Sequence, residues 1–138
     1  MKTSARNQLK GTVTSIIEGK VNDEVVLDIS GTPLKAVITK EAVQDLGLAA
    51  GSEVYAIIKA SFVMVSKDKP GKISTRNVIE TKVDDIIEGL VSCELKLSTG
   101  GTHLAAIVTE EAAKDLAIAK GDTVYALIKA SSIILAQY

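Results

Sequence analysis

The residues of this chain that could do chemistry are cationic and hydroxyl-bearing, and they occur twice at the same spacing. Arginine and lysine offer only hydrogen-bond donors, and a serine hydroxyl can donate as well. Charged donors form the strongest hydrogen bonds to anions. This inventory therefore suits binding of an anion better than catalysis of a reaction. The repeated set is Ser4, Arg6 and Lys59-Ala60-Ser61 in the first half, and Ser74, Arg76 and Lys129-Ala130-Ser131 in the second.

The whole chain repeats in the same frame as these residues. Residues 4–68 align with residues 74–138 without a gap, and about 45% of the aligned positions are identical. The sequence therefore predicts a tandem duplication, with a first domain at 1–68 and a second at 74–138. A charged linker at 69–73, which holds the second of the chain's two prolines, joins them.

Five short strands and one helix are expected in each repeat. In the first repeat, apolar alternation and turn signals predict strands at 9–17, 21–29, 34–38, 54–58 and 62–65. A short helix begins after Thr39 and ends at Gly47 or Gly51. One helix before the fourth of five strands is typical of a small OB-type barrel. We therefore expect an all-β fold of two tandem OB-like barrels.

Each candidate residue also has a purely structural interpretation. Arg6 and Lys59 could simply lie at exposed strand ends, although both recur in the second copy while other charges changed. Thr39 and Thr109 are expected to cap helices, and the alternative is that they direct a hydroxyl or helix amides at an anion. The sequence leaves both pairs of alternatives open.

Composition limits the class of protein. The net charge is −1, so no overall basic field attracts nucleic acid or an acidic membrane surface. A single cysteine, Cys93, fits a reducing compartment, and no apolar run approaches the roughly 20 residues of a membrane span. No secretory signal is evident, so we expect a cytoplasmic protein. Small aliphatic units predict that the two halves contact each other and that the chain self-associates.

Signatures of catalysis and of nucleic-acid binding are weak. The single histidine, His103, follows a glycine-rich turn and is interpreted as a surface residue, and Asp84-Asp85 is interpreted as a solvated pair. Cys93 aligns with Asp23 and is interpreted as a bystander thiol. The chain has one phenylalanine, three tyrosines and no tryptophan, too few for a base-stacking surface. We expect neither an enzyme nor a nucleic-acid-binding protein.

The motifs together resemble the molbindins, the Mop-domain proteins, and specifically their tandem two-domain form. The resemblance rests on Ser4–Asn7, Gly11–Val13, Glu18–Val25, Ile38–Ala42 and Ile58–Ser61, and it extends over both copies. It implies an OB-like barrel per domain, a homotrimer, and molybdate or tungstate bound at subunit interfaces. It implies no catalysis, and a cytoplasmic role in molybdenum storage and homeostasis. The alternative is an oxyanion-sensing accessory module that signals to, or delivers molybdate to, a protein partner.

Site residues follow from the resemblance by position. Thr39 and Thr109 would each come from a neighbouring domain, and a further site on the threefold axis would use the loop Gly19, Lys20, Val21 and Asn22. In the second copy Leu90-Val91-Ser92 departs from that loop, and Thr75 replaces Ala5. The implied oxyanion-binding residues are Ser4, Ala5, Arg6, Thr39, Lys59, Ala60, Ser61, Ser74, Thr75, Arg76, Thr109, Lys129, Ala130 and Ser131.

Overall fold

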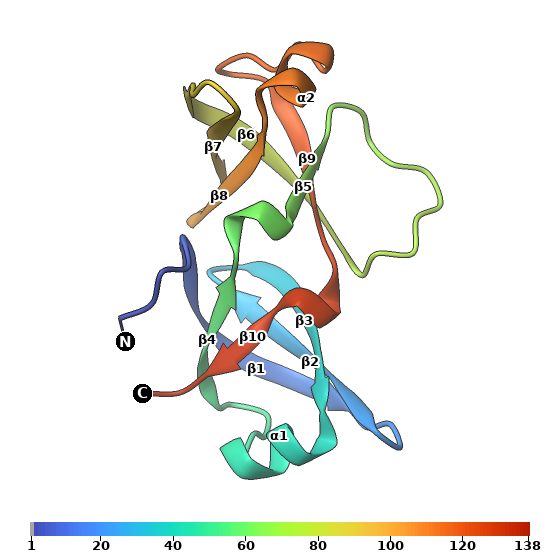
Figure 1. Cartoon of the computed structure of the whole chain (residues 1–138). Coiled ribbons are helices and arrows are strands. Elements are labelled where there is room, and N and C mark those ends of the chain that lie inside the picture. Colours follow the sequence, from blue (N-terminus) through green and yellow to red (C-terminus); the bar gives the residue numbers. More distant parts are fainter. Residues whose placement is uncertain (1) are drawn as a thin grey trace.

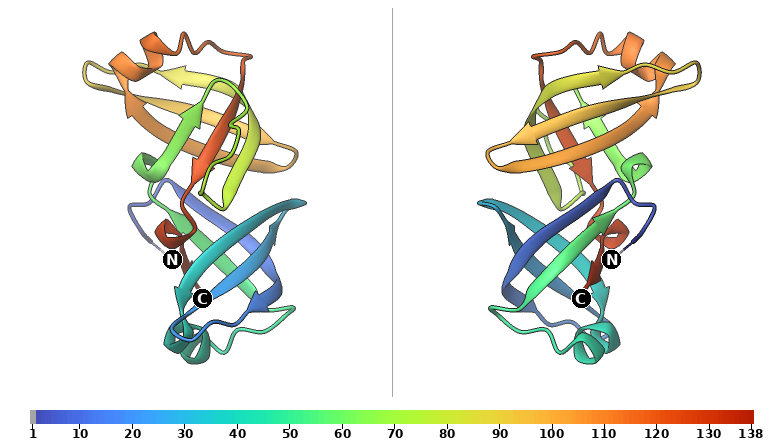
Figure 2. Two further views of the ribbon diagram at one scale, coloured as in Figure 1. Left: turned by 90° about the vertical axis from the view of Figure 1, so that its right-hand side faces the viewer. Right: turned by 90° about the vertical axis from the view of Figure 1, so that its left-hand side faces the viewer.

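Two curled five-stranded antiparallel sheets form the molecule, one above the other (Figure 1). The computed structural model describes residues 2–138, so the first residue of the predicted domain 1–68 lies outside the described part. The two views of Figure 2 show the same stacked arrangement from either side. The predicted all-β fold with two OB-like units of five strands, each with one short helix, is confirmed.

The elements of the two repeats follow the same order. The first repeat contains β1 (Asn7–Ile17), β2 (Asn22–Ile29), β3 (Thr32–Thr39), α1 (Lys40–Leu46), β4 (Glu53–Ile58), the 3-10 turn η1 (Ala60–Phe62) and β5 (Val63–Ser66). The second contains β6 (Asn77–Ile87), β7 (Ser92–Thr99), β8 (Thr102–Thr109), α2 (Glu110–Asp115), β9 (Thr123–Ile128), η2 (Ala130–Ser132) and β10 (Ile134–Ala136).

The fifth strands are exchanged between the two units. The lower sheet of Figure 1 has the order β10-β4-β1-β2-β3, and the upper sheet has the order β5-β9-β6-β7-β8. Each folded unit therefore takes its last strand from the other repeat. The boundaries 1–68 and 74–138 remain predictions for the sequence repeats. A folded unit combines four strands of one repeat with one strand of the other, because η1 and η2 carry the chain across the junction.

Aliphatic side chains fill both sheets. Val25, Leu27 and Val54 are fully buried in the first unit, and Leu95 and Val124 are equally buried in the second. Alternate residues along β2 and β7 are buried, which is the period-two pattern that the sequence predicted. A β-bulge between Val13 and Ser15 interrupts the register of β1 with β2, and β6 has the same bulge. Bulges of this kind help a sheet to curl.

Glycine is required where the β1–β2 and β6–β7 hairpins turn. A Cβ atom on Gly19 would lie 2.2 Å from the carbonyl oxygen of Asn22, and one on Gly89 would lie 2.5 Å from that of Ser92. Both distances are far inside van der Waals contact. The repeated Glu-Gly pair is therefore explained by the hairpin itself.

The helices begin at threonine, as the sequence predicted. The Thr39 hydroxyl accepts a hydrogen bond from the N–H of Ala42 at 3.1 Å, and Thr109 does the same for Ala112 at 3.0 Å. Helix α1 ends at Gly47 with φ +60°. Within residues 2–138, no helix combines the length and apolar character needed to cross a membrane.

Candidate functional site

Strand pairing brings together the two segments that carry the repeated donors. Asn7 of β1 lies opposite Ile58 of β4, so the segment before β1 and the segment after β4 leave the sheet side by side. Asn77 and Ile128 form the same pair in the second unit. Ser4–Arg6 therefore adjoins residues 59–61, and 74–76 adjoins 129–131. Two stretches separated by more than 50 residues thus supply one edge.

Each of these edges exposes charge and hydroxyl over a buried alanine. Ala60 and Ala130 are 2% and 4% exposed, while Lys59, Ser61 and Arg6 are exposed. The 3-10 turn is closed by the N–H of Phe62, which donates to the Lys59 carbonyl at 2.9 Å. The first N–H groups of such a turn have no partner within it. The arrangement therefore presents an ammonium group, hydroxyls and backbone donors on one side.

Thr75 differs from the other hydroxyls in this set. Its Oγ1 donates to the carbonyl oxygen of Ile128 at 2.8 Å. A hydroxyl has a single proton, so Thr75 in this arrangement does not donate to an anion. Its counterpart in the first repeat is Ala5, which has no hydroxyl, and the two edges therefore offer the same number of side-chain donors here.

Asn7 and Asn77 connect the two units and were not among the predicted site residues. Asn7 Nδ2 donates to the Ala105 carbonyl at 2.9 Å, and its Oδ1 accepts from the Ala105 N–H at 2.7 Å. Asn77 makes the same two bonds to Lys35, both at 2.8 Å. Each amide thereby pairs with a strand of the opposite unit as a peptide group would. The signal that could have revealed this role is the retention of asparagine after arginine in both copies.

The arginines also reach across the junction. Arg6 Nε lies 3.7 Å from Glu94 Oε1, and Arg76 Nε lies 3.6 Å from Glu24 Oε1. Both arginine side chains are 64% exposed, whereas the glutamate side chains are 15% and 16% exposed. The two pairs are equivalent in the repeats. At these distances the partners form ion pairs without a short hydrogen bond.

The Arg6 edge has additional charged neighbours. Arg6 and Glu94 line a surface groove together with Lys96 and His103, which is exposed near the start of β8. The residues that align with Lys96 and His103 in the first repeat are Val26 and Pro33, whereas Lys35 lies at the Arg76 edge where the Arg6 edge has Ala105. The two edges share the repeated arginine, lysine and serine donors, and they differ in the residues that surround these donors.

Thr39 lies away from Arg6 in the same chain, and Thr109 is its equivalent in the second repeat. Figure 1 shows α1, which begins after Thr39, at the opposite end of the lower unit from η1 and the N-terminal segment. Each threonine hydroxyl accepts the capping bond and keeps its own proton free to donate. One chain alone therefore does not bring Thr39 to Arg6, and a pocket that contains both requires a second chain.

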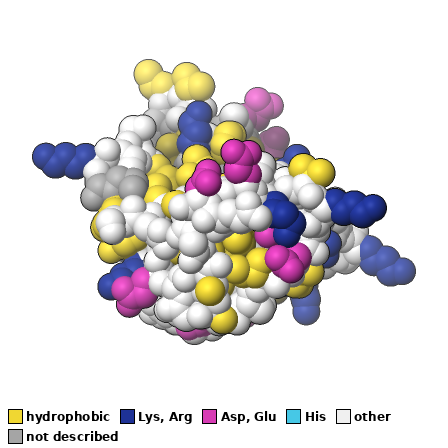
Figure 3. Space-filling view, turned by 90° about the horizontal axis from the view of Figure 1, so that it is seen from below, with side chains coloured by type: hydrophobic (Ala, Val, Ile, Leu, Met, Phe, Trp, Pro, Cys, Tyr) yellow, Lys and Arg dark blue, Asp and Glu magenta, His cyan; other side chains and the backbone are white. Residues whose placement is uncertain are grey.

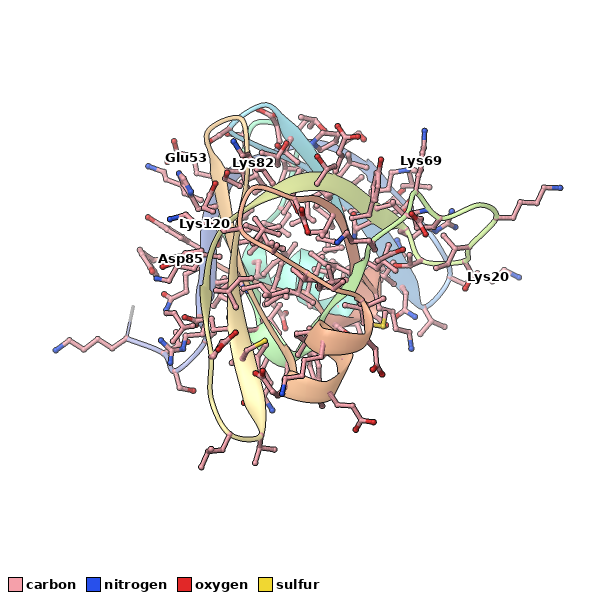
Figure 4. The ribbon with its side chains drawn as sticks, turned by 90° about the horizontal axis from the view of Figure 1, so that it is seen from above. Lys20, Glu53, Lys69, Lys82, Asp85 and Lys120 are labelled. Carbon is pink, nitrogen blue, oxygen red and sulfur yellow. The ribbon has the colours of Figure 1, made fainter. Side chains whose placement is uncertain are left out.

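The loop predicted for a threefold-axis site is an exposed hairpin tip. Gly19, Lys20, Val21 and Asn22 are all exposed, and Lys20 points outward at the periphery of the molecule (Figure 4). Figure 3 shows the α1 end of the molecule, where basic, acidic and apolar side chains are interspersed without a large patch of one sign.

Comparisons with known proteins identify the sequence relationships. The TOBE domain family matches residues 3–65 and 73–135. The chain is 41% identical over 140 residues to the molybdenum transport protein ModE of Azotobacter vinelandii, covering all of this chain and 52% of that protein. It is 54% identical over 66 residues to a probable molybdenum-pterin-binding protein of Haemophilus influenzae, covering 47% of this chain and 96% of that protein.

A solved structure matches over the full length of both chains. This is the cytoplasmic molybdate-binding protein ModG in a form with molybdate bound, at 42% sequence identity and a TM-score of 0.95. The chain spans about half the length of the longer curated relatives that it matches, including the Azotobacter protein. The shared fold therefore extends to the relative arrangement of the two units.

Proposed function

The chain belongs to the TOBE-domain family of molbindins, and from this premise we propose that it binds molybdate and tungstate at subunit interfaces of a homotrimer. We propose further that it stores the oxyanion and buffers its concentration in the cytoplasm, and that it catalyses no reaction. The observation that carries the proposal is the repeated convergence of arginine, lysine and serine on one edge of each unit. The full-length likeness to ModG supports the choice of ligand.

The donor inventory explains why a tetrahedral dianion fits. Arg6 and Lys59 supply charge, and Ser4, Ser61 and turn amides supply further donors for an ion that has only acceptors. Sulfate has the same charge and shape but is smaller, so donors fixed for a larger ion cannot all reach it. Each charge-assisted bond forgone costs on the order of 1.5–3 kcal/mol.

A second chain completes the proposed pocket. Thr39 lies at the far end of the unit and keeps a hydroxyl proton that it can donate. We propose that a neighbouring subunit contributes its own Thr39 to each site. The exposed apolar residues Ile17 and Val21, with their equivalents Ile87 and Val91, support self-association, because isolated monomers rarely expose such repeated apolar sets.

Thermal unfolding with oxyanions tests this function. Ligand at about 100 times its Kd stabilises the folded state by about 2.7 kcal/mol, so molybdate should raise the Tm by several degrees and equal sulfate by far less. The variant Arg6→Ala/Arg76→Ala should lose most of the molybdate effect, whereas Lys120→Ala, which removes an exposed cation elsewhere, should keep it (Figure 4). Equal shifts with sulfate and molybdate would defeat the proposed selectivity.

Native mass spectrometry tests the assembly. The expected species contains three chains and gains mass in steps of the bound oxyanion when molybdate is added. If the protein is a monomer that binds molybdate, the proposed location of the sites at subunit interfaces is wrong, but the proposed ligand is still correct.

A sensing or delivery module is the second candidate function. It is favoured by the Azotobacter relative, a transport protein in which the matched region is about half of the length. This alternative expects a protein partner that associates with the chain only when molybdate is present. Pull-down with and without molybdate distinguishes it from storage, which requires no such partner.

A further inference from the structure

Two acidic residues lie beside the proposed anion sites, and their placement conflicts with simple anion binding. Glu94 lies 3.7 Å from Arg6, and Glu24 lies 3.6 Å from Arg76. A carboxylate next to a dianion site repels the ligand, because charges within the Debye length of about 8–10 Å interact with little screening. Such a residue therefore needs a reason to occupy the equivalent position in both copies.

The geometry shows what the two carboxylates contact. Each glutamate lies on the fourth strand of its sheet, beside the edge strand, with most of its side chain shielded from water, and the arginine reaches it from the opposite unit. Glu24 Oε1 has no hydrogen-bond partner among the described residues, so the arginine is its charge compensation. The contact distance is long and the guanidinium is mostly exposed. A pair of this kind is weak and exchangeable.

We infer that Glu94 and Glu24 are internal counter-ions that compete with the oxyanion for Arg6 and Arg76. This inference rests on the proposed function and assigns the two glutamates a role in setting affinity and selectivity. In the structure each arginine is paired with a glutamate across the junction. A bound dianion must draw the guanidinium away from a carboxylate that is poorly solvated, or share it with that carboxylate.

The competition raises the threshold for binding and thereby favours ligands that make many contacts. A molybdate ion that engages arginine, lysine and several hydroxyls at once compensates for the disrupted pair. An anion that reaches fewer donors does not. The counter-ions thus make the sites discriminate against smaller and more weakly bound anions. They also place part of each site's control in the other repeat, since Arg6 belongs to the first repeat and Glu94 to the second.

Isothermal titration on single-site variants tests the inference. Arg76→Ala leaves the Arg6 edge as the intact site, and adding Glu94→Gln should tighten its Kd for molybdate about tenfold and its Kd for sulfate at least as much. Glu94→Asp keeps the charge and should retain the original affinity. Glu53→Gln removes the same charge at the far end of β4, five residues from Ile58, and should leave the Kd within about twofold (Figure 4).

The outcomes separate this inference from the proposed function. If the unaltered chain binds neither molybdate nor tungstate, both the function and the inference are wrong. If it binds and Glu94→Gln leaves the Kd unchanged or weakens it, only the counter-ion role is wrong, because a merely structural contact cannot give tighter binding when lost. Should Glu94→Gln not fold, the reciprocal pair Arg6→Ala and Glu24→Gln applies the same test to the Arg76 edge.

Discussion

The first hairpin of this molecule is held by charges, whereas the equivalent second hairpin has lost them. In the first, the buried carboxylate of Asp23 accepts a hydrogen bond from the N–H of Gly19 at 3.0 Å, and Lys40 Nζ lies 3.3 Å from both Asp23 and Glu18. Burial opposes the change, but the hydrogen bonds to Glu18 and Asp23 raise the pKa of Lys40. In the second hairpin the aligned residues are Cys93 for Asp23 and Glu110 for Lys40.

The second hairpin keeps the backbone and replaces the side-chain interactions. The Lys40 N–H donates to the Val21 carbonyl at 2.8 Å, and the Glu110 N–H donates to the Val91 carbonyl at 2.9 Å. Burial, and secondarily the charges of Glu110 and Glu88, raise the pKa of the Cys93 thiol, so it is neutral at pH 7. The comparison indicates that a neutral side chain such as Cys93 can be buried at this position without a lysine, whereas the carboxylate of Asp23 is buried together with Lys40.

Substitutions that make the second hairpin resemble the first should have the largest effect on the free energy of unfolding. Cys93→Asp alone places a buried carboxylate beside Glu110, where the nearby cation, Lys114, is exposed and already pairs with Glu110 at 4.0 Å, and we expect a loss of about 3–5 kcal/mol in unfolding free energy. Adding Glu110→Lys should recover most of this loss, because it recreates the Asp23–Lys40 pair. Urea unfolding of the two single variants and the double variant measures the coupling. Additive losses would mean that the hairpins differ in more than these two positions.

Because the fifth strands are exchanged, a substitution in one repeat should destabilise the unit that is formed mainly by the other repeat. Leu135 in β10 lies opposite Ala56 of β4, so Leu135→Ala should cost about 2–4 kcal/mol and lower hydrogen-exchange protection in β4. Val65 lies opposite Ala126 of β9, and Val65→Ala should instead expose β9, at a smaller cost because Val65 is only partly buried. Loss of protection within the mutated residue's own repeat would contradict the exchange.

The helix ends provide the smallest and most controlled comparison. Gly47 ends α1 with φ +60°, whereas Ala117 adopts φ +50° at the aligned position after α2. Ala117→Gly should stabilise by about 1 kcal/mol and Gly47→Ala should destabilise by about as much, because a Cβ atom disfavours the left-handed region. Shifts in Tm of opposite sign are expected. Lys67 Nζ also binds the Ala117 carbonyl at 2.7 Å, which holds this conformation in place.

Part of the site was predictable from the sequence, and part was not. Arg6 and Lys59 were predicted as site residues because identical residues recur at identical spacing. Thr39 was predicted as a helix cap because a helix start has a local signature, and its proposed place in the site came from the family resemblance. Glu94 and Asn7 were missed as site neighbours, because their partners belong to the other repeat. No local pattern in the sequence states which residues face each other across a junction.

The sequence by itself determined the repeats, the positions of the strands and helices, and the donors available to an anion. These depend on local periodicity, capping and composition, which are encoded within each repeat. Only the tertiary structure decided where the fifth strands pair. The candidate partners, Tyr55-Ala56-Ile57 and Tyr125-Ala126-Leu127, are nearly identical, so either would accept β5 or β10 with similar packing. The path of the chain through η1 and η2 across the junction determines which strand each fifth strand pairs with. That path is a property of the tertiary structure and is not visible in the residue pattern.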